Sequence, residues 1–308
     1  MSTDRTDHSL AYTIPFQLTK KIHRTVPPEL SPERPENSAK GKVIVITGGG
    51  TGIGAAAAKI WTQAGATGVV IAGRRQEVLD KTVKELQAFK KEDTKIFAVA
   101  TDITKEADTE NLFASVKSAF GRTADVVLAN AGFSKPGKPH EQTSETWWKT
   151  MEINLLGLHN TAVSFIRSQT NPNEPGGTFI AVGSGMAGLN APTHSSYSIS
   201  KLAGQRYLEY LDLEYPTLRV FYVLPGIVAT DMQKEVGEAF EPYAKDQAEL
   251  SGALALYLAS SRADYLKGSM TSINYDIGEM EEHKEEIEKG LLKIKWISPL
   301  PINGGSGF

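Results

Sequence analysis

A short apolar segment, followed at once by a glycine-rich loop and a run of alanines, constrains this chain more than any other feature. Residues 42–47, KVIVIT, form a mostly β-branched run, as expected of a strand buried on both faces of a sheet. The loop over 47–54 contains five glycines, which suit a backbone that turns tightly or approaches another group closely. The helix-like segment AAAAKIWTQAG then ends near Gly65. Together these segments predict a strand, a tight turn and a helix of a parallel α/β sheet.

The same alternation of strand-like and helix-like segments continues along the chain. Further strands are expected at 68–73, 95–101, 125–130, 178–184 and 219–225. The helices expected between or after them are 76–90, 106–120, 145–167 and 197–214, and a helix near 246–260 and a strand near 269–275 complete the series. Such βαβ units, with their right-handed crossovers, build a doubly wound parallel sheet. We therefore predict a single α/β domain of the Rossmann type.

Changes in composition mark the two ends of this domain. Residues 1–40 contain five prolines and no long periodic pattern, so we expect an arm that either packs over the body or is partly disordered. Residues 41–278 carry the alternating pattern, and 279–308 form a C-terminal extension. Its charged run, EMEEHKEEIEKG, is typical of a solvated helix. The apolar side chains after that run are expected to pack on the body, cover a pocket or meet a partner subunit: Leu291, Leu292, Ile294 and Trp296.

Charge and cysteine content exclude several classes of function. With 33 basic and 36 acidic residues the net charge is −3, so no basic excess points to nucleic acid. The chain has no cysteine, which excludes disulfides, thiolate metal sites and a cysteine nucleophile, and we identify no other metal-ligand set. No apolar run approaches the roughly 20 residues of a membrane helix. The first ten residues also lack the apolar core of a secretory signal, and we expect a soluble cytoplasmic protein.

The position of the glycine loop predicts a phosphate-binding role. The N-terminus of the following helix offers free N–H groups and the positive end of the helix dipole to an anion. In a sheet of this type that place holds the pyrophosphate of a dinucleotide. An ordinary glycine-rich turn is the alternative, and the flanking strand and helix make it less favourable. The residues expected to contact the cofactor here are Thr47, Gly48, Gly50, Thr51, Gly52, Ile53 and Gly54.

The end of the second strand distinguishes the two nicotinamide dinucleotides. An NAD site usually places Asp or Glu about 20 residues past the loop, where it binds the ribose 2′-hydroxyl. This chain has Arg74 and Arg75 there, and its first acid, Glu77, comes later. Guanidinium groups suit a 2′-phosphate, which predicts NADP(H). The alternative is a pair of solvated arginines at a helix start.

Tyr197 and Lys201 open a predicted helix and lie one turn apart on the same face. A free tyrosine has a pKa near 10, and a neighbouring ammonium is expected to lower the pKa of Tyr197 enough for acid/base work. Lys201 is also expected to bind the nicotinamide ribose. Ser184 lies thirteen positions before Tyr197, at the end of a strand, where its hydroxyl would hold a substrate carbonyl. Tyr-x-x-x-Lys by itself is also common on solvated helix faces.

These motifs, in this order, resemble those of the short-chain dehydrogenase/reductase family from about Ala39 to Gly278. The chain departs from the family pattern in its longer arm, in the sequence Asp276-Ile277-Gly278 where a glycine pair is common, and in its charged C-terminal extension. The matching features are Thr47-Gly48-x-x-x-Gly52-x-Gly54, Asp102-Ile103, Asn130-Ala131-Gly132, Asn154, Ser184, Tyr197-x-x-x-Lys201 and Pro225-Gly226-Ile227-Val228-Ala229-Thr230.

The resemblance implies roles that spacing alone does not show. Asp102 would meet the adenine amine beside Ile103, and Asn130 would steady the central sheet next to the cofactor. Asn154 would anchor a water that links Lys201 to solvent as a proton relay. The nicotinamide half of the cofactor would be contacted by Pro225, Gly226, Ile227 and Thr230, with the Ile227 backbone near the carboxamide.

The reaction that these residues predict is reduction of a ketone or aldehyde by NADPH, or the reverse oxidation of an alcohol, with Tyr197 as general acid/base. An isomerase, epimerase or lyase on the same fold is one alternative, and a cofactor-sensing interaction protein is another. The intact set of Asn154, Ser184, Tyr197 and Lys201 disfavours the sensor.

The substrate pocket is expected from 133–140, 185–196 and the stretch after Thr230, whose side chains suit an apolar, bulky carbonyl compound. Within it, His194 is interpreted as a surface-loop histidine, with substrate contact as the alternative. The long arm and tail loosely resemble reductases of specialised metabolism. The family resemblance also suggests a homodimer or homotetramer through helices 145–167 and 197–214. Trp147 and Trp148 suit that interface or the core equally.

Overall fold

The computed structural model describes residues 7–91, 93–232 and 238–295. All seven strands lie in one parallel sheet with the order β3-β2-β1-β4-β5-β6-β7. The direction of winding reverses between β1 and β4, the point at which open α/β sheets bind ligands. The strands are β1 (Val43–Thr47), β2 (Gly68–Gly73), β3 (Lys95–Ala100), β4 (Val126–Ala129), β5 (Thr178–Val182), β6 (Arg219–Leu224) and β7 (Met270–Ser272). The predicted fold class is confirmed, although β7 is shorter than the strand expected at 269–275.

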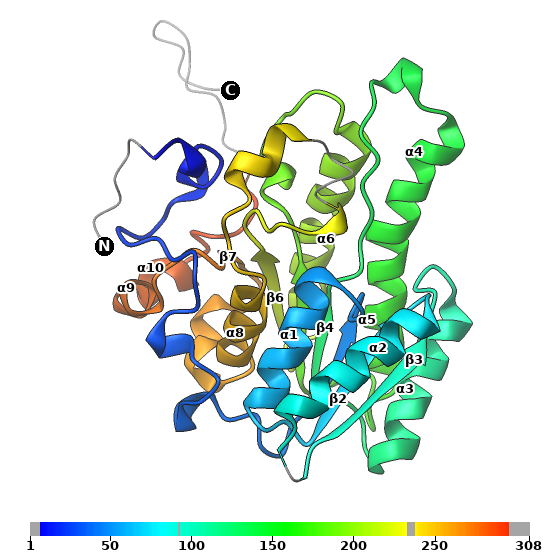
Figure 1. Ribbon diagram of the computed structural model, residues 1–308. Helices are drawn as coiled ribbons and strands as arrows, with labels where there is room; N and C mark the ends of the chain where they lie inside the picture. The colour runs from blue at the N-terminus through cyan, green and yellow to red at the C-terminus, as the bar shows by residue number, and fades with distance from the viewer. Residues whose placement is uncertain (1–6, 92, 233–237, 296–308) are drawn as a thin grey trace, which may run out of the picture.

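Helices cover both faces of this sheet (Figure 1). One face packs against α1 (Gly52–Gln63), α2 (Gln76–Leu86) and α8 (Glu249–Leu258). The other packs against α3 (Glu106–Phe120), α5 (Gly157–Arg167) and α6 (Ser195–Glu214). The helix expected at 145–167 is divided into α4 (Ser144–Met151) and α5 by a π-helical segment, η7 (Glu152–Leu156).

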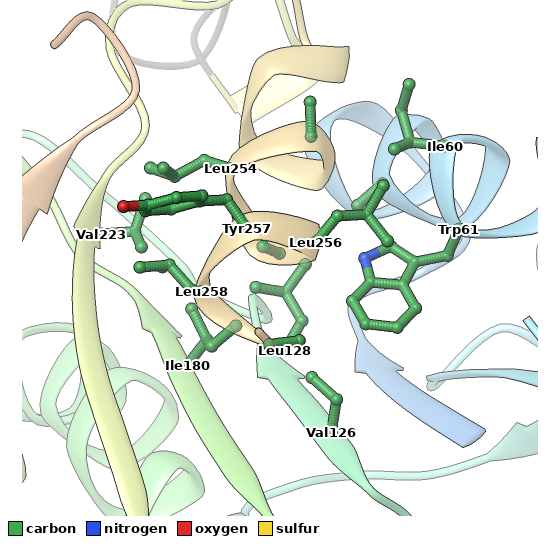
Figure 2. Close-up of a cluster of buried hydrophobic side chains, with 14 of the residues drawn as sticks. Ile60, Trp61, Val126, Leu128, Ile180, Val223, Leu254, Leu256, Tyr257 and Leu258 are labelled. Atoms are coloured by element: carbon green, nitrogen blue, oxygen red, sulfur yellow. The ribbon is translucent and has the colours of Figure 1, made fainter. Parts of the chain in front are cut away.

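Alternation along the buried strands divides the apolar side chains between two cores. On β1, for example, Ile44 and Ile46 face the α1 and α8 side, whereas Val43 and Val45 face the α3 and α5 side. Figure 2 shows α8 lying across the first of these cores, with Tyr257 above strands β5 and β6 and the indole of Trp61 closing the α1 side. The continuous apolar runs of the sequence therefore reflect a sheet buried on both faces.

The described part of the N-terminal arm, 7–40, runs along the edge of the domain as short 3-10 helices (Figure 1). These are η1 (His8–Leu10), η2 (Ile14–Phe16), η3 (Pro28–Leu30) and η4 (Pro35–Asn37). Leu10 and Leu30 are buried, and Ile22 forms an antiparallel bridge with Tyr275 just past β7. The arm thus packs on the end of the sheet that carries the last strand.

The C-terminal extension begins with two short helices, α9 (Ile277–Glu282) and α10 (Lys284–Glu288), rather than one solvated helix. Within the charged run, the side chains of Met280 and Ile287 are buried and belong to the same hydrophobic core as α8. Leu292 is buried and its carbonyl accepts a hydrogen bond from Met270 N, whereas Leu291 is exposed. Trp296 lies outside the described residues.

Candidate active site

The glycine loop connects the end of β1 to α1 at the switch point of the sheet. Gly48 and Gly52 adopt positive φ angles of 65° and 53°, which side chains rarely tolerate. Gly54 is required for a different reason, because a Cβ there would lie 2.2 Å from the carbonyl oxygen of Gly48. Thr51 precedes the first turn of α1 without capping it by a side-chain hydrogen bond. The N–H groups of that turn are thus not capped by Thr51 and are suited to an anion.

A polar cleft extends from this loop over the ends of β2 and β3. Its walls include Gly50, Thr51, Arg74, Arg75 and Asp102. Both arginines are exposed, and Arg75 lies at the N-terminus of α2 without capping it through its side chain. Burial acts to raise the pKa of Asp102, but hydrogen bonds from Thr104 and the nearby charge of Arg74 hold that pKa below its ordinary value.

Thr47 and Asn130 join the two central strands at the floor of the cleft. The Thr47 hydroxyl accepts hydrogen bonds from the backbone N–H groups of Asn130 and Ala131, each at 3.1 Å. In return the Asn130 amide donates to the carbonyl oxygens of Thr47 at 3.0 Å and of Gly48 at 3.2 Å. This reciprocal set of bonds holds the glycine loop against the end of β4.

Asn154 lies in the π-helical segment, which turns its amide toward the end of β4. Its Oδ1 accepts from Phe133 N at 2.8 Å, and its Nδ2 donates to Phe133 O at 2.8 Å and to Ser200 Oγ at 2.9 Å. π turns interrupt helices frequently at functional sites. The bonds to Phe133 and Ser200 link the loop after β4 to α6, the helix that carries Tyr197 and Lys201.

Tyr197, Lys201 and Ser184 come together as expected at the carboxyl end of β5. The Lys201 ammonium lies 5.7 Å from the centre of the Tyr197 ring, and it donates to the carbonyl oxygen of Val182 at 2.9 Å. Ser184 follows β5, and its hydroxyl lies close enough to Tyr197 to act on the pKa of that side chain. Ser184 also accepts from Met186 N at 3.2 Å, so that it caps the next short helix. The three side chains thus form one cluster at the end of β5.

The expectation of a lowered tyrosine pKa is wrong for the protein without cofactor. Burial raises the pKa of Tyr197, and the hydrogen bond with Ser184 opposes that rise only in part. Burial also lowers the pKa of Lys201 to about 8. The ammonium is directed to Val182 and lies over the tyrosine ring, which is why it does not act on the hydroxyl as the spacing suggested.

The loop after β6 differs from the expectation in one contact. Ile227 N donates to Asp246 Oδ2 at 2.7 Å, and Asp246 N donates to Ile227 O at 3.1 Å. The Ile227 N–H is therefore already bonded within the protein, and a contact with a carboxamide requires that bond to be exchanged. Gly226 has a positive φ of 67° and sits against the Asp246 carboxylate, where a Cβ would approach to 2.3 Å.

A second, largely apolar cavity adjoins Tyr197. Segments 185–196 and Met232 contribute to it as predicted, whereas 133–140 contributes Ser134. The sequence reasoning missed the arm, which supplies Tyr12, Phe16 and Ile22 to the wall. The aromatic residues within this proline-rich segment were the only feature of the sequence that could have predicted its place in the cavity wall. The start of the arm and the segment around η9 (Glu238–Tyr243) lie at the same end of the sheet in Figure 1, and Tyr12 contacts the rings of Phe240 and Tyr243.

The interpretation of His194 as a surface-loop residue is wrong. Its side chain is only 7% exposed and lines the apolar cavity. The ring packs edge-on against Phe240, with centroids 6.2 Å apart. The local sequence around His194 predicts an exposed turn. The side chain is buried because the arm and η9 pack over the loop 185–196.

The two cavities suit a nicotinamide dinucleotide and a small organic substrate. The polar cleft combines a helix N-terminus suited to an anion, glycines that let a bound group come close to the backbone, and exposed arginines. These features match a phosphate-rich group. Tyr197 and Ser184 line the apolar cavity, and Gly132 links the cleft to the cluster, since a Cβ there would lie 3.3 Å from Asn154 Oδ1 and 3.6 Å from Lys201 Nζ. The residues present therefore fit the cofactor.

Comparison with known proteins identifies the family. Residues 42–241 match the family described as short chain dehydrogenase. Short chain dehydrogenase pigC of Monascus ruber is 30% identical over 292 residues, which cover 92% of this chain and 94% of that protein. Short chain dehydrogenase tazN of Aspergillus terreus is 28% identical over 298 residues, which cover 94% of this chain and 64% of tazN. A short-chain type dehydrogenase/reductase from Mycobacterium marinum is 26% identical with a TM-score of 0.70, covering 77% of this chain and 95% of that one.

The chain belongs to the short-chain dehydrogenase/reductase family, a family of oxidoreductases that use a nicotinamide cofactor. Within the described residues, no helix is both long and apolar enough to span a membrane.

Proposed function

We propose that this protein is an NADPH-dependent carbonyl reductase in which Tyr197 is the general acid. The observation that carries the proposal is that Tyr197 and Ser184 line an apolar cavity, with the Lys201 ammonium over the tyrosine ring, while a polar cleft extends from the glycine loop. Ser184 and Tyr197 would both bind one carbonyl oxygen. The same residues would run the reverse reaction with an alcohol.

The polar cleft would hold the cofactor, which supplies hydride to the carbonyl carbon. The residues around the glycine loop and the uncapped turn of α1 would bind the pyrophosphate. Arg74 and Arg75 would bind a 2′-phosphate, because both are exposed at the cleft and no acid occupies the end of β2. Asp102 and Ile103 would border the adenine in the cleft. The nicotinamide half would reach into the apolar cavity, which Pro225, Gly226, Ile227 and Thr230 line.

The protein's own residues would bind and protonate the carbonyl oxygen. Ser184 would orient the oxygen, and Tyr197 would transfer its proton as the negative charge develops there. For Lys201 to stabilise the resulting phenolate, its ammonium would have to leave Val182 O and turn toward the hydroxyl. A small cavity bordered by Asn154, Ser200 and Lys201 is a suitable place for a water that returns a proton from solvent.

The similarity to proteins of Monascus ruber and Aspergillus terreus supports a reaction in specialised metabolism. An isomerase, epimerase or lyase would use Tyr197 for proton transfer without net consumption of NADPH. The test is therefore a panel of apolar ketones in which NADPH oxidation and product formation are measured together. One-to-one stoichiometry supports the reductase, and product without NADPH oxidation would replace it by the isomerase class.

The acid itself is tested by Tyr197→Phe, with Tyr207→Phe on the same helix as the matched control. Loss of a general acid lowers turnover by about 10²–10⁴-fold, while the NADPH dissociation constant, followed by tryptophan fluorescence, should stay near that of the wild type. Tyr207 hydrogen-bonds to His159 outside both cavities, so its variant should remain active. A Tyr197→Phe enzyme that keeps more than about a tenth of wild-type turnover would exclude this role.

We further propose a cytoplasmic homodimer or homotetramer formed through α4, α5 and α6. The large apolar side chains exposed on these helices and on η7 are Trp148, Leu156, Ile199, Leu202, Tyr210 and Leu213. Trp147 is less exposed than its neighbour. Light scattering after gel filtration should give a multiple of 33.4 kDa, and Leu213→Glu, at a side chain that is 73% exposed, should reduce it. A wild-type monomer at micromolar concentration would contradict the proposal.

A further inference from the structure

The apolar cavity contains an acceptor atom that has no partner among the described residues. His194 Nδ1 lies 2.8 Å from the carbonyl oxygen of Pro192, and because a carbonyl can only accept, Nδ1 carries the proton of the neutral ring. Nε2 is then a bare acceptor. It is buried, and no described residue forms a hydrogen bond with it. Since the side chain lines the cavity, a bound molecule is the partner that can satisfy it.

The backbone that presents His194 is strained. Thr193 has φ of 68°, and throughout 7–91, 93–232 and 238–295 it is the only residue other than glycine with a positive φ. This conformation is costly for a β-branched side chain and persists where surrounding contacts enforce it, which is most often at functional sites. One such contact is the hydrogen bond from Gly137 N to Thr193 O at 2.8 Å.

The strained turn also fixes His194 relative to Tyr197. His194 O accepts the first hydrogen bond of α6, from Ser198 N at 2.8 Å, so that the histidine begins the helical turn that carries Tyr197. The ring is held on its other side by Phe240. A substrate whose carbonyl binds Tyr197 and Ser184 therefore lies in the same cavity as the Nε2 acceptor.

We propose that His194 Nε2 accepts a hydrogen bond from a hydroxyl group of the substrate, which makes the substrate an apolar carbonyl compound with a separate hydroxyl. This inference rests on the proposed reductase function. A neutral donor is favoured over an ammonium, because no Asp, Glu, Lys or Arg is found among the described residues that line the cavity. A site that binds a hydroxyl by hydrogen bonding discriminates strongly against an analogue that lacks the donor.

The experiment compares ring-hydroxylated acetylnaphthalenes with their methyl ethers and with the parent ketones, using kcat/KM with NADPH. Methylation keeps the oxygen and removes the donor, but it also adds a methyl group. A loss that is caused by this bulk alone should persist in His194→Leu. In the wild type, at least one hydroxylated isomer should exceed its methyl ether by about tenfold or more. In His194→Leu that ratio should fall to about one. In His194→Gln, whose amide oxygen can accept at a similar reach, part of the preference should return.

Two further variants make the result specific. His283→Leu removes an exposed histidine near α10 and should leave the ratio unchanged. Among the described residues, Ser134 is the other buried polar side chain of the cavity without a hydrogen-bond partner, and Ser134→Ala removes it. If this variant alone abolishes the preference, the hydroxyl binds Ser134 and our assignment is wrong. A ratio near one in the wild type, or unchanged in His194→Leu, would also overturn it. If no ketone is reduced at all, the failure is that of the reductase function itself.

Discussion

Arg24 of the N-terminal arm donates from Nε to Asp246 Oδ1 at 2.9 Å, while the other carboxylate oxygen of Asp246 holds Ile227 N. The Asp246 carboxylate is fully buried, and the Arg24 side chain is 17% exposed. Arg24 also donates to Tyr243 O and Ser9 Oγ, and Asn274 donates to Asp246. One buried ion pair thus connects the arm, the segment just after the last strand and the loop after β6.

Arg24→Met is expected to lower the free energy of unfolding by about 3 kcal/mol, because it leaves a buried carboxylate without its cation. Urea unfolding followed by tryptophan fluorescence measures the change. The control is Arg34→Met in the same arm, whose ion pair with Glu36 is about half exposed on both sides. That variant should keep nearly the stability of the wild type, because solvent screens an exposed ion pair. Equal small losses in both variants would show that the arm does not depend on the buried pair.

Arg74→Asp is expected to weaken NADPH binding by about 10- to 100-fold while affecting NADH much less, since it removes a charged donor to the 2′-phosphate. Fluorescence titration with both cofactors gives the two dissociation constants. Lys40→Asp makes the same change in net charge at an exposed position in the arm and should bind both cofactors like the wild type. NADH binding tighter than NADPH in the wild type would contradict the assignment.

Gly54→Ala is expected to abolish dinucleotide binding and to destabilise the protein by about 1–3 kcal/mol, because the new methyl group would overlap the Gly48 carbonyl. Cofactor titration and thermal unfolding measure the two effects. Gly176→Ala is the matched control, since a Cβ there meets nothing within 4 Å and its φ is not positive. A Gly54→Ala protein that binds cofactor normally would mean that the loop relaxes without cost.

Replacing Lys201 by Met should change stability in a pH-dependent way. Burial lowers the pKa of Lys201 from 10.5 to about 8. Below pH 8 the ammonium is charged in both the folded and unfolded chains, so its desolvation destabilises the wild type fully. Between pH 8 and 10.5 the folded chain has released the proton that the unfolded chain still binds, and this cost disappears as pH rises.

The wild type should therefore gain stability relative to Lys201→Met as the pH is raised from 7 to 10. Urea unfolding of both proteins at several pH values gives the difference, in which the contributions of other titrating groups cancel. A difference that stays constant over this range would show that the lysine keeps an ordinary pKa in the folded protein.

The linear sequence predicted most of the fold because each strand is a short apolar run and each helix follows it within a few residues. The sequence also predicted three local features, because the geometry of each depends on one turn or one helix. These features are the glycine loop, the position of Arg74 and Arg75 at the end of a strand, and the spacing of Tyr197 and Lys201. Asn154 was singled out only through family resemblance, since nothing in the residues around it predicts the π turn that directs its amide to Phe133.

By itself, the sequence determined the order of strands and helices and the residues at each carboxyl end of the sheet, since backbone propensity and burial patterns act over short distances. Only the tertiary structure decided that Tyr12 and Phe16 line the apolar cavity, that Arg24 pairs with Asp246, and that His194 is buried. It also decided that burial raises the pKa of Tyr197, against the expectation from its neighbouring lysine. These features depend on contacts between segments that are far apart in the sequence, 222 positions in the case of Arg24 and Asp246. They also depend on the exclusion of solvent by those contacts.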